Sequence, residues 1–452
     1  MENRLKAGER QAKISLALMV AACLIGVYSQ VVLPARAGAE MWSLARSIAD
    51  HGTFANPFMV LATGPTAVNP PGYPFILAGF IKVFRMMSHA YYAAVLGCIL
   101  VNAATAALLP RVALVFFGDA IPGIAASILW LATMQTIPGW DTNYTVLGLI
   151  VFCLVTAPVL RMDGYAGWRA CLGGIVAGCL FLMNPSTVLV TFPWIGYLLW
   201  RTRARLRSAC IYCGIIVFMM SLFVLGWSSR NYIQLGGFVT RTNLGFTLYA
   251  SNNDCAQSSL IKEELSGCYG ASHPNENLRE AELLHKIGEI QYDHLRVADT
   301  KAWMKANPDS FLRLTGARAL EFWFPAREVI PAGEGGFISI FNIPNYARRW
   351  AAQQNRIAYI MWLVTALSWP GLVLMVRRRE PVTPYVLAVS VVYPLMYYIV
   401  VSDMRYRYPV LWLSLLPAGY LLRDVLMKIG RASGKISADA WKRISATLNP
   451  VQ

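Results

Sequence analysis

One stretch of the chain combines an acidic residue with a helical pattern of apolar side chains. As a helix, residues 39–52 present one apolar face, formed by Met41, Leu44 and Ile48. The opposite face carries Glu40, Ser43, Ser47 and Asp50, and Gly52 is suited to cap the C-terminal end. A carboxylate such as Glu40 can act as a general base toward a hydroxyl group. The alternative is an ordinary solvated polar face, which every amphipathic helix has.

A loop rich in proline and glycine follows this predicted helix. Residues 63–74 read Thr-Gly-Pro-Thr-Ala-Val-Asn-Pro-Pro-Gly-Tyr-Pro, and so many turn formers predict a stiff segment. It offers two polar side chains, Asn69 and Tyr73, which we predict to bind substrate. The loop is suited to form the wall of a site at the membrane surface.

The composition shows which kind of protein must position these residues. The chain has 452 residues, of which 56% are hydrophobic and 14% charged. Soluble domains carry about 25% charged residues, so a water-soluble domain is excluded. The high content of aromatic residues excludes a disordered chain. The remaining class is an all-α polytopic membrane protein with about 10–11 transmembrane helices.

Ten apolar runs are long enough to be read as membrane crossings. They are 14–34, 88–109, 120–138, 143–160, 170–184, 187–200, 208–228, 357–376, 382–401 and 408–426. We interpret the first run as a retained helix rather than a signal peptide. Segment 73–86 is also apolar but contains Lys82 and Arg85, and we predict an interfacial or re-entrant helix on the outer side.

The basic residues are distributed as the positive-inside rule requires. With the N-terminus in the cytoplasm, the cytoplasmic segments hold 20 of the 40 Lys and Arg residues but only 7 of the 24 acidic ones. The net charge of +16 is therefore a topology signal, and a nucleic-acid partner is not expected. This topology predicts two segments on the extracytoplasmic side of the membrane, the juxtamembrane loop 35–87 and the large loop 229–356.

This topology divides the chain into three parts. They are an N-terminal transmembrane module, 1–228, a mainly helical extracytoplasmic loop domain, 229–356, and a C-terminal part, 357–452, with helices and a basic cytoplasmic tail. Within the loop domain, 277–307 is predicted to form one or two helices that Asn307-Pro308 terminates, and 311–323 is predicted to form another.

Two of the nine cysteines lie outside the apolar runs. Cys255 and Cys268 fall in the large outer loop, an oxidising environment in which we predict a disulfide between them. The chain contains no nucleotide-binding P-loop, zincin or hydrolase-elbow motif. Four scattered histidines are interpreted as solvated loop groups, namely His51, His273, His285 and His294.

An ordered set of motifs resembles the GT-C superfamily, polytopic glycosyltransferases that use polyprenyl-phosphate sugars. The group includes protein O-mannosyltransferases and the lipid A aminoarabinose transferase. The matching elements are Glu40 with 44–48, the Pro-Pro-x-Tyr-Pro element at 70–74, Arg230-Asn231-Tyr232 with Gly245, Asn252-Asn253, Gly288-Glu289 and Tyr292, and Arg405-Tyr406-Arg407-Tyr408-Pro409. They span most of the chain in the order of the superfamily.

The sequence also departs from that pattern. The superfamily usually has Asp where Glu40 stands, and in the aminoarabinose transferase that Asp falls about one helical turn earlier, near Ala37. That enzyme has a Lys before the first proline of its loop, whereas this chain has Asn69.

The resemblance implies roles for individual residues of the N-terminal catalytic module and the last helix. A lipid-phosphate sugar has a good leaving group, so the remaining tasks are to deprotonate the acceptor and to stabilise the departing phosphate. We assign the first task to Glu40 and the second to Arg405 and Arg407, with Arg230 as a further substrate-binding residue. The alternative for the two arginines of the last helix is snorkelling to the membrane surface.

Asp141 is the second acidic candidate, because it is the only charged residue in its short outer loop. The superfamily often has an acidic residue near this place, where it positions the acceptor or a metal. The alternative is that Asp141 caps the following helix. A divalent cation is therefore considered, but no metal ligand set is assigned, since two separated carboxylates without histidine do not form one.

The predicted function is an inverting glycosyltransferase that moves a sugar from a polyprenyl-phosphate donor to a glycan, lipid or protein hydroxyl. It is expected in a bacterial inner membrane, with its active site on the extracytoplasmic side and membrane lipid around it. A surface polysaccharide polymerase or ligase is the nearest alternative. A transporter is disfavoured, because its charges would lie near the middle of its helices, where this chain has almost none.

Overall fold

The computed structural model describes residues 2–34, 38–160, 166–327 and 346–433. Four predicted features lie partly or wholly outside the described residues. They are the juxtamembrane loop (35–37), one cytoplasmic loop (161–165), the large outer loop (328–345) and the basic tail (434–452). Within the described residues the secondary structure is helical, with two isolated β-bridges and no β-strand. The all-α class is confirmed.

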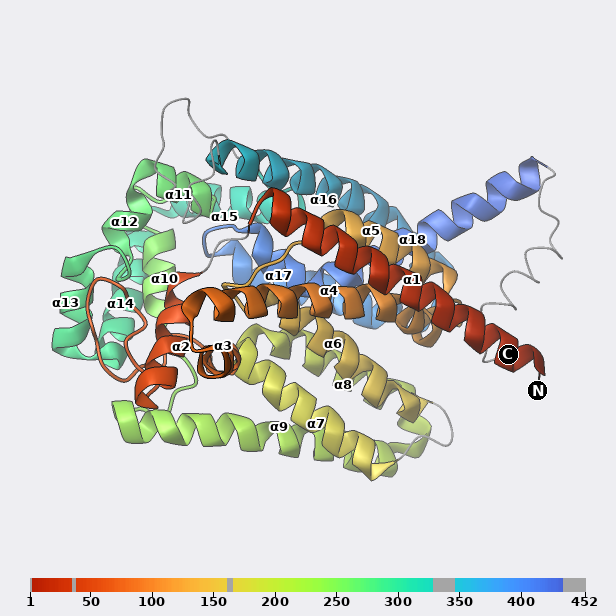
Figure 1. Cartoon of the computed structure of the whole chain (residues 1–452), viewed down its shortest axis with the longest axis horizontal. Helices are drawn as coiled ribbons and strands as arrows, with labels where there is room; N and C mark the ends of the chain where they lie inside the picture. The colour runs from red at the N-terminus through yellow and green to blue at the C-terminus, as the bar shows by residue number, and fades with distance from the viewer. Residues whose placement is uncertain (1, 35–37, 161–165, 328–345, 434–452) are drawn as a thin grey trace.

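Ten helices correspond to the ten predicted crossings. They are α1 Glu2–Val32, α4 Met87–Phe117, α5 Ile121–Thr133, α6 Thr142–Thr156, α7 Gly167–Met183, α8 Val188–Arg201, α9 Leu206–Leu235, α16 Tyr346–Arg377, α17 Thr383–Tyr398 and α18 Met404–Ala432. Figure 1 shows them packed along the long axis of the molecule, with the start of α1 and the end of α18 toward the same end of the bundle.

Six described helices are long and apolar enough to cross a membrane by length and composition, and they are α1, α4, α6, α9, α16 and α18. The other four helices of the bundle are shorter than the roughly 20 residues of a full crossing and pack between the long ones. Three tryptophans, Trp130, Trp194 and Trp412, are fully buried in the core of the bundle. The chain is an integral membrane protein.

Two short helices between α1 and α4 carry the first candidate residues. Helix α2 (Ala39–His51) ends at Gly52, whose left-handed backbone (φ 69°) lets its N–H bond to the carbonyl of Ile48. The predicted apolar face of α2 packs against α3 (Gly72–Phe84). In Figure 1 α3 is seen nearly end-on, so it runs across the long helices. The interfacial or re-entrant position of 73–86 on the outer side stays a prediction.

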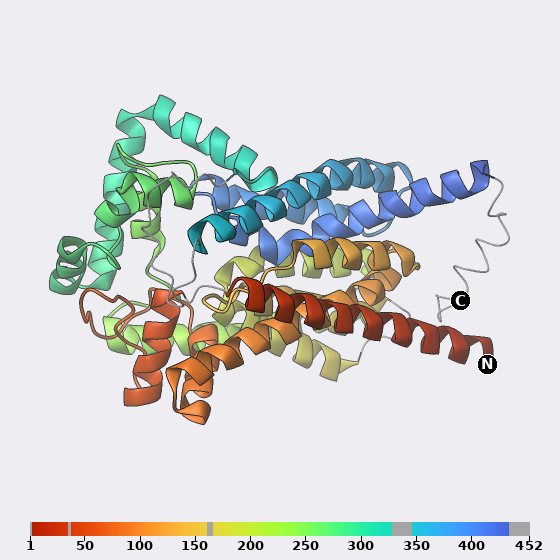
Figure 2. The ribbon, with the colours of Figure 1, turned by 45° about the horizontal axis from the view of Figure 1, so that its top comes forward.

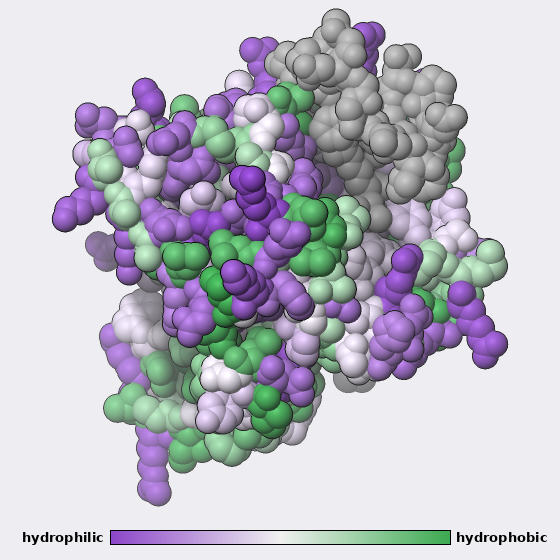
Figure 3. All heavy atoms as spheres, turned by 90° about the vertical axis from the view of Figure 1, so that its left-hand side faces the viewer, coloured by the Kyte–Doolittle hydropathy of each residue, from purple (hydrophilic) through white to green (hydrophobic). Residues whose placement is uncertain are grey.

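Between α9 and α16 the described residues form six further helices. They are α10 Leu244–Ser251, α11 Leu260–Ser266, α12 Cys268–Ser272, α13 Leu278–Ile287, α14 Glu289–Ala306 and α15 Pro308–Trp323. Figures 1 and 2 show α10–α14 at the end of the bundle opposite the start of α1. Figure 3 shows hydrophilic side chains over much of that end. The treatment of 229–356 as a separate domain stays a prediction.

The predicted helix breaks are found in this region. The stretch 277–307 forms two helices, because Gly288 (φ 84°) separates α13 from α14. Asn307-Pro308 ends α14 as predicted, and Pro308 begins α15, three residues before the helix predicted at 311–323. Gly245 allows α10 to lie close to α14, since a Cβ there would be 2.0 Å from the carbonyl oxygen of Asp293.

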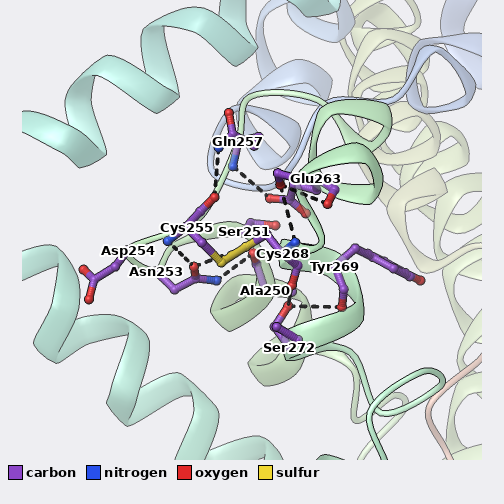
Figure 4. Close-up of a disulfide and its surroundings, with 12 residues drawn as sticks. Ala250, Ser251, Asn253, Asp254, Cys255, Gln257, Glu263, Cys268, Tyr269 and Ser272 are labelled. Carbon is purple, nitrogen blue, oxygen red and sulfur yellow. Dashed lines mark hydrogen bonds between the residues drawn. A yellow bond between two sulfur atoms is a disulfide. The ribbon is translucent and has the colours of Figure 1, made fainter. Parts of the chain in front are cut away.

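The predicted disulfide between Cys255 and Cys268 is confirmed, with the two Cα atoms 5.7 Å apart. It joins the segment after α10 to the first residue of α12, and Asn253 accepts a hydrogen bond from the backbone N–H of Cys255 (2.9 Å). Figure 4 shows the Tyr269 side chain extending from α12 away from the disulfide. The bond therefore anchors the short helix that carries Tyr269.

Candidate active site

A cavity of about 360 Å³ at the end of the bundle where α2 and α10–α12 lie brings together four of the predicted site residues, Glu40, Asn69, Asp141 and Arg405. We call it the reaction cavity. Its walls come from α2, from the loops before α3, α6 and α10, from α10–α12, and from the α17–α18 junction. Segments from the whole length of the chain are therefore needed to build it.

Glu40 lies in the first turn of α2 and is only 8% exposed, so it does not belong to a solvated polar face. Its Oε2 accepts a hydrogen bond of 3.0 Å from the side-chain amide of Asn69. Its Oε1 lies 3.5 Å from Nε2 of His273. The carboxylate is thus approached from two sides and still lines the cavity.

The interpretation of His273 as a solvated loop group is wrong. The side chain is 7% exposed, stacks on Tyr269 with ring centroids 4.6 Å apart, and meets the edge of Phe246. These partners lie on α10 and α12, which the sequence did not place beside one another. Sequence reasoning gave no signal for this contact.

The hydrogen bonds of His273 define its tautomer. Its Nδ1 accepts a hydrogen bond of 3.1 Å from the backbone N–H of Asn275, which leaves the proton on Nε2, facing Glu40. Burial lowers the pKa of His273, the charge of Glu40 opposes this effect, and the charge of Arg405 adds to it. A neutral imidazole that donates toward the Glu40 carboxylate follows from this arrangement.

The loop that carries Asn69 is held by side chains from distant elements. The guanidinium of Arg230 donates to the carbonyl oxygens of Thr66 (2.7 Å) and Phe54 (2.8 Å). The carboxylate of Glu289 accepts the backbone N–H of Ala67 (2.7 Å). Arg230, predicted to bind substrate, does not line the reaction cavity and instead fixes the loop that delivers Asn69 to it.

Tyr73 also acts behind the cavity rather than in it. Its ring is fully buried, and its hydroxyl donates to the carbonyl oxygen of Pro138 over 2.7 Å. Pro138 precedes Trp140 and Asp141, which both line the cavity. The predicted substrate-binding residue therefore ties the start of α3 to the segment that presents Asp141.

Asp141 is 7% exposed and occupies the position before α6 that a capping residue would take. Its side chain does not cap the backbone of the helix, and instead Oδ2 accepts a hydrogen bond from the Thr145 hydroxyl (2.7 Å). Burial raises the pKa of Asp141, while hydrogen bonds from Thr145 and Asn184 and the charge of Arg241 oppose the rise. The structure thus offers a second carboxyl group in the cavity.

The two arginines of the predicted phosphate clamp point in different directions. Arg405 lines the cavity, pairs with Asp403 (2.9 Å) and lies 4.0 Å from the ring centre of Trp140. Arg407 is buried elsewhere, where it donates to the carbonyl oxygen of Trp323 (2.7 Å). Residues two apart on a helix project from nearly opposite faces, so the pair cannot bind one phosphate together.

A second cavity arginine comes from a segment that sequence reasoning missed. Arg241 lies in the loop between α9 and α10, and its Nε donates to the carbonyl oxygen of Val68 over 2.9 Å. Burial lowers the pKa of Arg241, and the charges of Asp141 and Glu40 oppose that effect. Arg241 therefore places a cation in the cavity beside the loop that carries Asn69.

Among the described residues, no three His, Cys, Asp or Glu side chains are grouped so that they could hold a metal ion. Glu40 and Asp141 line the cavity, but the one neighbouring imidazole presents a proton rather than a lone pair to Glu40. These groups do not form a ligand set, so we derive no step through a metal ion. The predicted divalent cation stays a prediction.

Neither a protein-family model nor a curated protein sequence matches the chain. Solved structures of the oligosaccharyltransferase of Archaeoglobus fulgidus do resemble it. The apo form has 12% sequence identity and a TM-score of 0.51 over 96% of this chain and 55% of that one. The form tethered with an acceptor peptide that contains an NVT sequon has 14% identity and a TM-score of 0.52, over 96% and 54%.

The chain spans about half the length of these structures, and at this identity the likeness concerns the fold. It includes both the long helices and helices α10–α15, because it covers nearly the whole chain. The chain therefore shares the fold of these oligosaccharyltransferase structures.

Proposed function

We propose that this protein is an inverting glycosyltransferase that moves a sugar from a polyprenyl-phosphate donor to the hydroxyl of a glycan, lipid or protein. One observation carries the proposal: a buried carboxylate, Glu40, and two guanidinium groups, Arg241 and Arg405, line the same cavity. The cavity lies at the outer end of a membrane bundle, where a lipid phosphate can reach it.

The reaction needs one base and stabilisation of one leaving group. The acceptor oxygen attacks the anomeric carbon while the bond from that carbon to the phosphate oxygen breaks, and its electron pair leaves with the polyprenyl phosphate. Glu40 takes the acceptor proton. A single displacement of this kind inverts the configuration of the anomeric carbon.

The leaving phosphate gains charge as the bond breaks, which is the task of Arg241 and Arg405. A guanidinium donates two parallel hydrogen bonds to phosphate oxygens, and such groups stabilise the transition state best when they are already in position. Arg405 meets this condition because Asp403 and Trp140 hold it. Arg241 is held by its hydrogen bond to Val68.

Other parts of the cavity suit the base and the lipid. The two donors beside Glu40, Asn69 and His273, orient the carboxylate and leave lone pairs for the acceptor. Apolar residues that line the same cavity, Leu244, Met396 and Val400, suit the first isoprene units of the donor. Asp141 is a second carboxyl group that can bind an acceptor hydroxyl.

The proposal is tested with purified protein in lipid nanodiscs. Decaprenyl phosphate carrying one radiolabelled sugar is mixed with envelope extract from a strain that lacks the gene. The donors form a panel that carries different hexoses, pentoses and aminopentoses. We expect one member of the panel to be consumed, decaprenyl phosphate to be released and the label to appear in the extract with inverted anomeric configuration. If no member is consumed, the proposal is refuted.

The proposed location of the site requires the outer helices to face away from the cytoplasm. Reporters fused after Arg207 and Arg379 should be cytoplasmic, and a reporter fused near Asn277 should be extracytoplasmic. A cytoplasmic reporter at Asn277 would contradict an extracytoplasmic reaction, because Glu40 lies at the same end of the bundle.

A further inference from the structure

A second cavity, of about 330 Å³, adjoins the reaction cavity. It lies among the outer ends of α1, α15 and α16 and beside α11, and we call it the polar cavity. Four residues line both cavities and form the wall between them, namely Trp140, Leu260, Tyr269 and Arg405. Its volume falls in the range of about 300–1,000 Å³ that is usual for ligand pockets.

The lining of the polar cavity is rich in groups that both donate and accept hydrogen bonds. Four glutamines contribute, Gln30, Gln135, Gln353 and Gln354. A side-chain amide offers two N–H donors and a carbonyl acceptor, which matches a ligand whose hydroxyl groups also do both. Two indole side chains, Trp140 and Trp350, are part of the same lining and offer flat apolar surfaces.

The charges of the polar cavity argue against a phosphate. Three carboxylates line it, Glu264, Glu321 and Asp403. Lys262 pairs with Glu321 (2.9 Å), and Arg405, the one cation among the described lining residues, pairs with Asp403. An anion would therefore meet carboxylates and an arginine that is already paired. Carboxylates are strong acceptors, however, for the hydroxyl groups of a neutral ligand.

Apart from Nε of Arg405, which pairs with Asp403, three polar atoms of the lining residues have no hydrogen-bond partner among the described residues. They are Nε2 of Gln135, a donor, Oγ of Ser259, which can donate or accept, and Oε2 of Glu321, an acceptor. Buried polar atoms without a partner are uncommon in folded proteins, and a ligand hydroxyl can pair with either kind.

We infer that the polar cavity binds a sugar ring. Trp140 and Arg405 form part of the wall that separates this ring from the carboxylate of Glu40. The inference rests on the proposed function, because the ligand of a cavity that shares a wall with the reaction site is part of the same reaction. The sugar belongs either to the lipid-linked donor or to a glycan acceptor. Both sources have the chemistry that glutamine, carboxylate and indole groups recognise.

The test uses Gln135→Leu in the full chain. Leucine keeps the approximate volume of the side chain but cannot form hydrogen bonds, and the backbone hydrogen bonds of residue 135 remain. The matched control is Gln234→Leu, the same substitution at an exposed residue near the outer end of α9 that lines neither cavity. Affinities are measured in nanodiscs for decaprenyl phosphate, for decaprenyl phosphate carrying a single sugar, and for a panel of free oligosaccharides.

We expect Gln135→Leu to weaken sugar binding by about tenfold, the effect of one lost hydrogen bond, and to leave binding of decaprenyl phosphate unchanged. Weaker binding of the lipid-linked sugar identifies the donor as the source, and weaker binding of a free oligosaccharide identifies the acceptor. Sugar affinities equal to those of Gln234→Leu in both arms overturn the inference. Failure of the proposed function would give a different result. In that case no donor of the panel is consumed in the turnover experiment, even though sugar binding is still measured.

Discussion

The reaction cavity and the polar cavity are neighbours of similar size but of different chemistry. The first combines Glu40 and Asp141 with two guanidinium groups and an apolar wall, whereas the second is lined by side-chain amides and carboxylates. Helix α11 shows how sharply they divide, because Glu263 lines the reaction cavity and the next residue, Glu264, lines the polar one. Carboxylates and guanidinium groups beside apolar residues suit group transfer, and side-chain amides and carboxylates suit the recognition of hydroxyl groups.

The two cavities also depend on the same wall. Tyr269 belongs to the short helix that the disulfide anchors, and Arg405 begins α18. Substitutions inside the reaction cavity should therefore change turnover or donor binding, and substitutions in elements that hold the wall should affect both cavities. The following predictions separate these cases.

The largest effect is expected from Glu40→Gln, which keeps size and hydrogen bonding but cannot accept a proton. Loss of a general base costs about 100–10,000-fold in rate. Turnover should fall by this amount while donor affinity stays near that of the wild type, as measured by transfer of radiolabel and by binding in nanodiscs. Asp50→Asn, at an exposed acid of the same helix, is the control. Near-normal turnover of Glu40→Gln would remove this residue from the mechanism and leave Asp141 as the candidate base.

Arg405→Ala and Arg241→Ala should each weaken binding of decaprenyl phosphate by about 10–100-fold, the value of a hydrogen bond to a charged group. Lysine at either position should restore only part of the affinity, because it lacks the planar fork of arginine. Arg407→Ala is the control within the same motif and should leave this affinity unchanged, since Arg407 bonds to Trp323 outside the cavity. An equal loss of affinity in Arg407→Ala would support the prediction that Arg405 and Arg407 bind one phosphate together.

Replacing both Cys255 and Cys268 by serine tests the shared wall. Closing a loop of about 15 residues stabilises a protein by roughly 3 kcal/mol in the chain-entropy model, so the midpoint of thermal unfolding should fall. Both donor turnover and oligosaccharide affinity should decrease, because Tyr269 faces both cavities. A loss confined to one cavity would show that the wall does not depend on the bond. Labelling of the unfolded, unreduced wild type with maleimide should modify at most seven of the nine cysteines.

His273→Phe tests how Glu40 is positioned. The phenylalanine keeps an aromatic ring beside Tyr269 but cannot donate to Glu40, so kcat should fall by about tenfold, the value of one hydrogen bond, with KM for the donor nearly unchanged. His273→Gln places an amide N–H near the position of Nε2 and should recover most of the rate. If both variants are equally slow, His273 has only a packing role.

The smallest effect concerns the stability of the reaction cavity at different pH values. Burial raises the pKa of Glu263 to about 7 from a usual value of 4.5. The folded state therefore binds this proton more tightly, and wild-type stability is lost as the pH rises from about 4.5 to about 7. Glu263→Gln should match the wild type near pH 4.5 and become more stable by about 1 kcal/mol per pH unit above it, as measured by thermal unfolding. A constant difference across this range would contradict the assignment.

Part of the site could be predicted because its signals are local. The amphipathic pattern of 39–52 placed Glu40 near the start of a helix, and the structure confirms that helix, its apolar face and its Gly52 cap. The separation of Arg405 from Arg407 was also accessible, since residues two apart on a helix project from nearly opposite faces. The position of His273 was not, because its partners Phe246 and Glu40 are distant in the chain.

The sequence by itself determined the membrane class, the ten apolar runs and the disulfide of this protein. These features depend on hydropathy, on the side of the membrane that basic residues select, and on where cysteines lie, and all three act over short stretches of chain. Only the tertiary structure decided that Asn69, His273 and Arg241 would surround Glu40, and that Tyr73 and Arg230 would hold the loops behind the cavity. Such contacts are set by the packing of separate helices and loops, which no local pattern specifies.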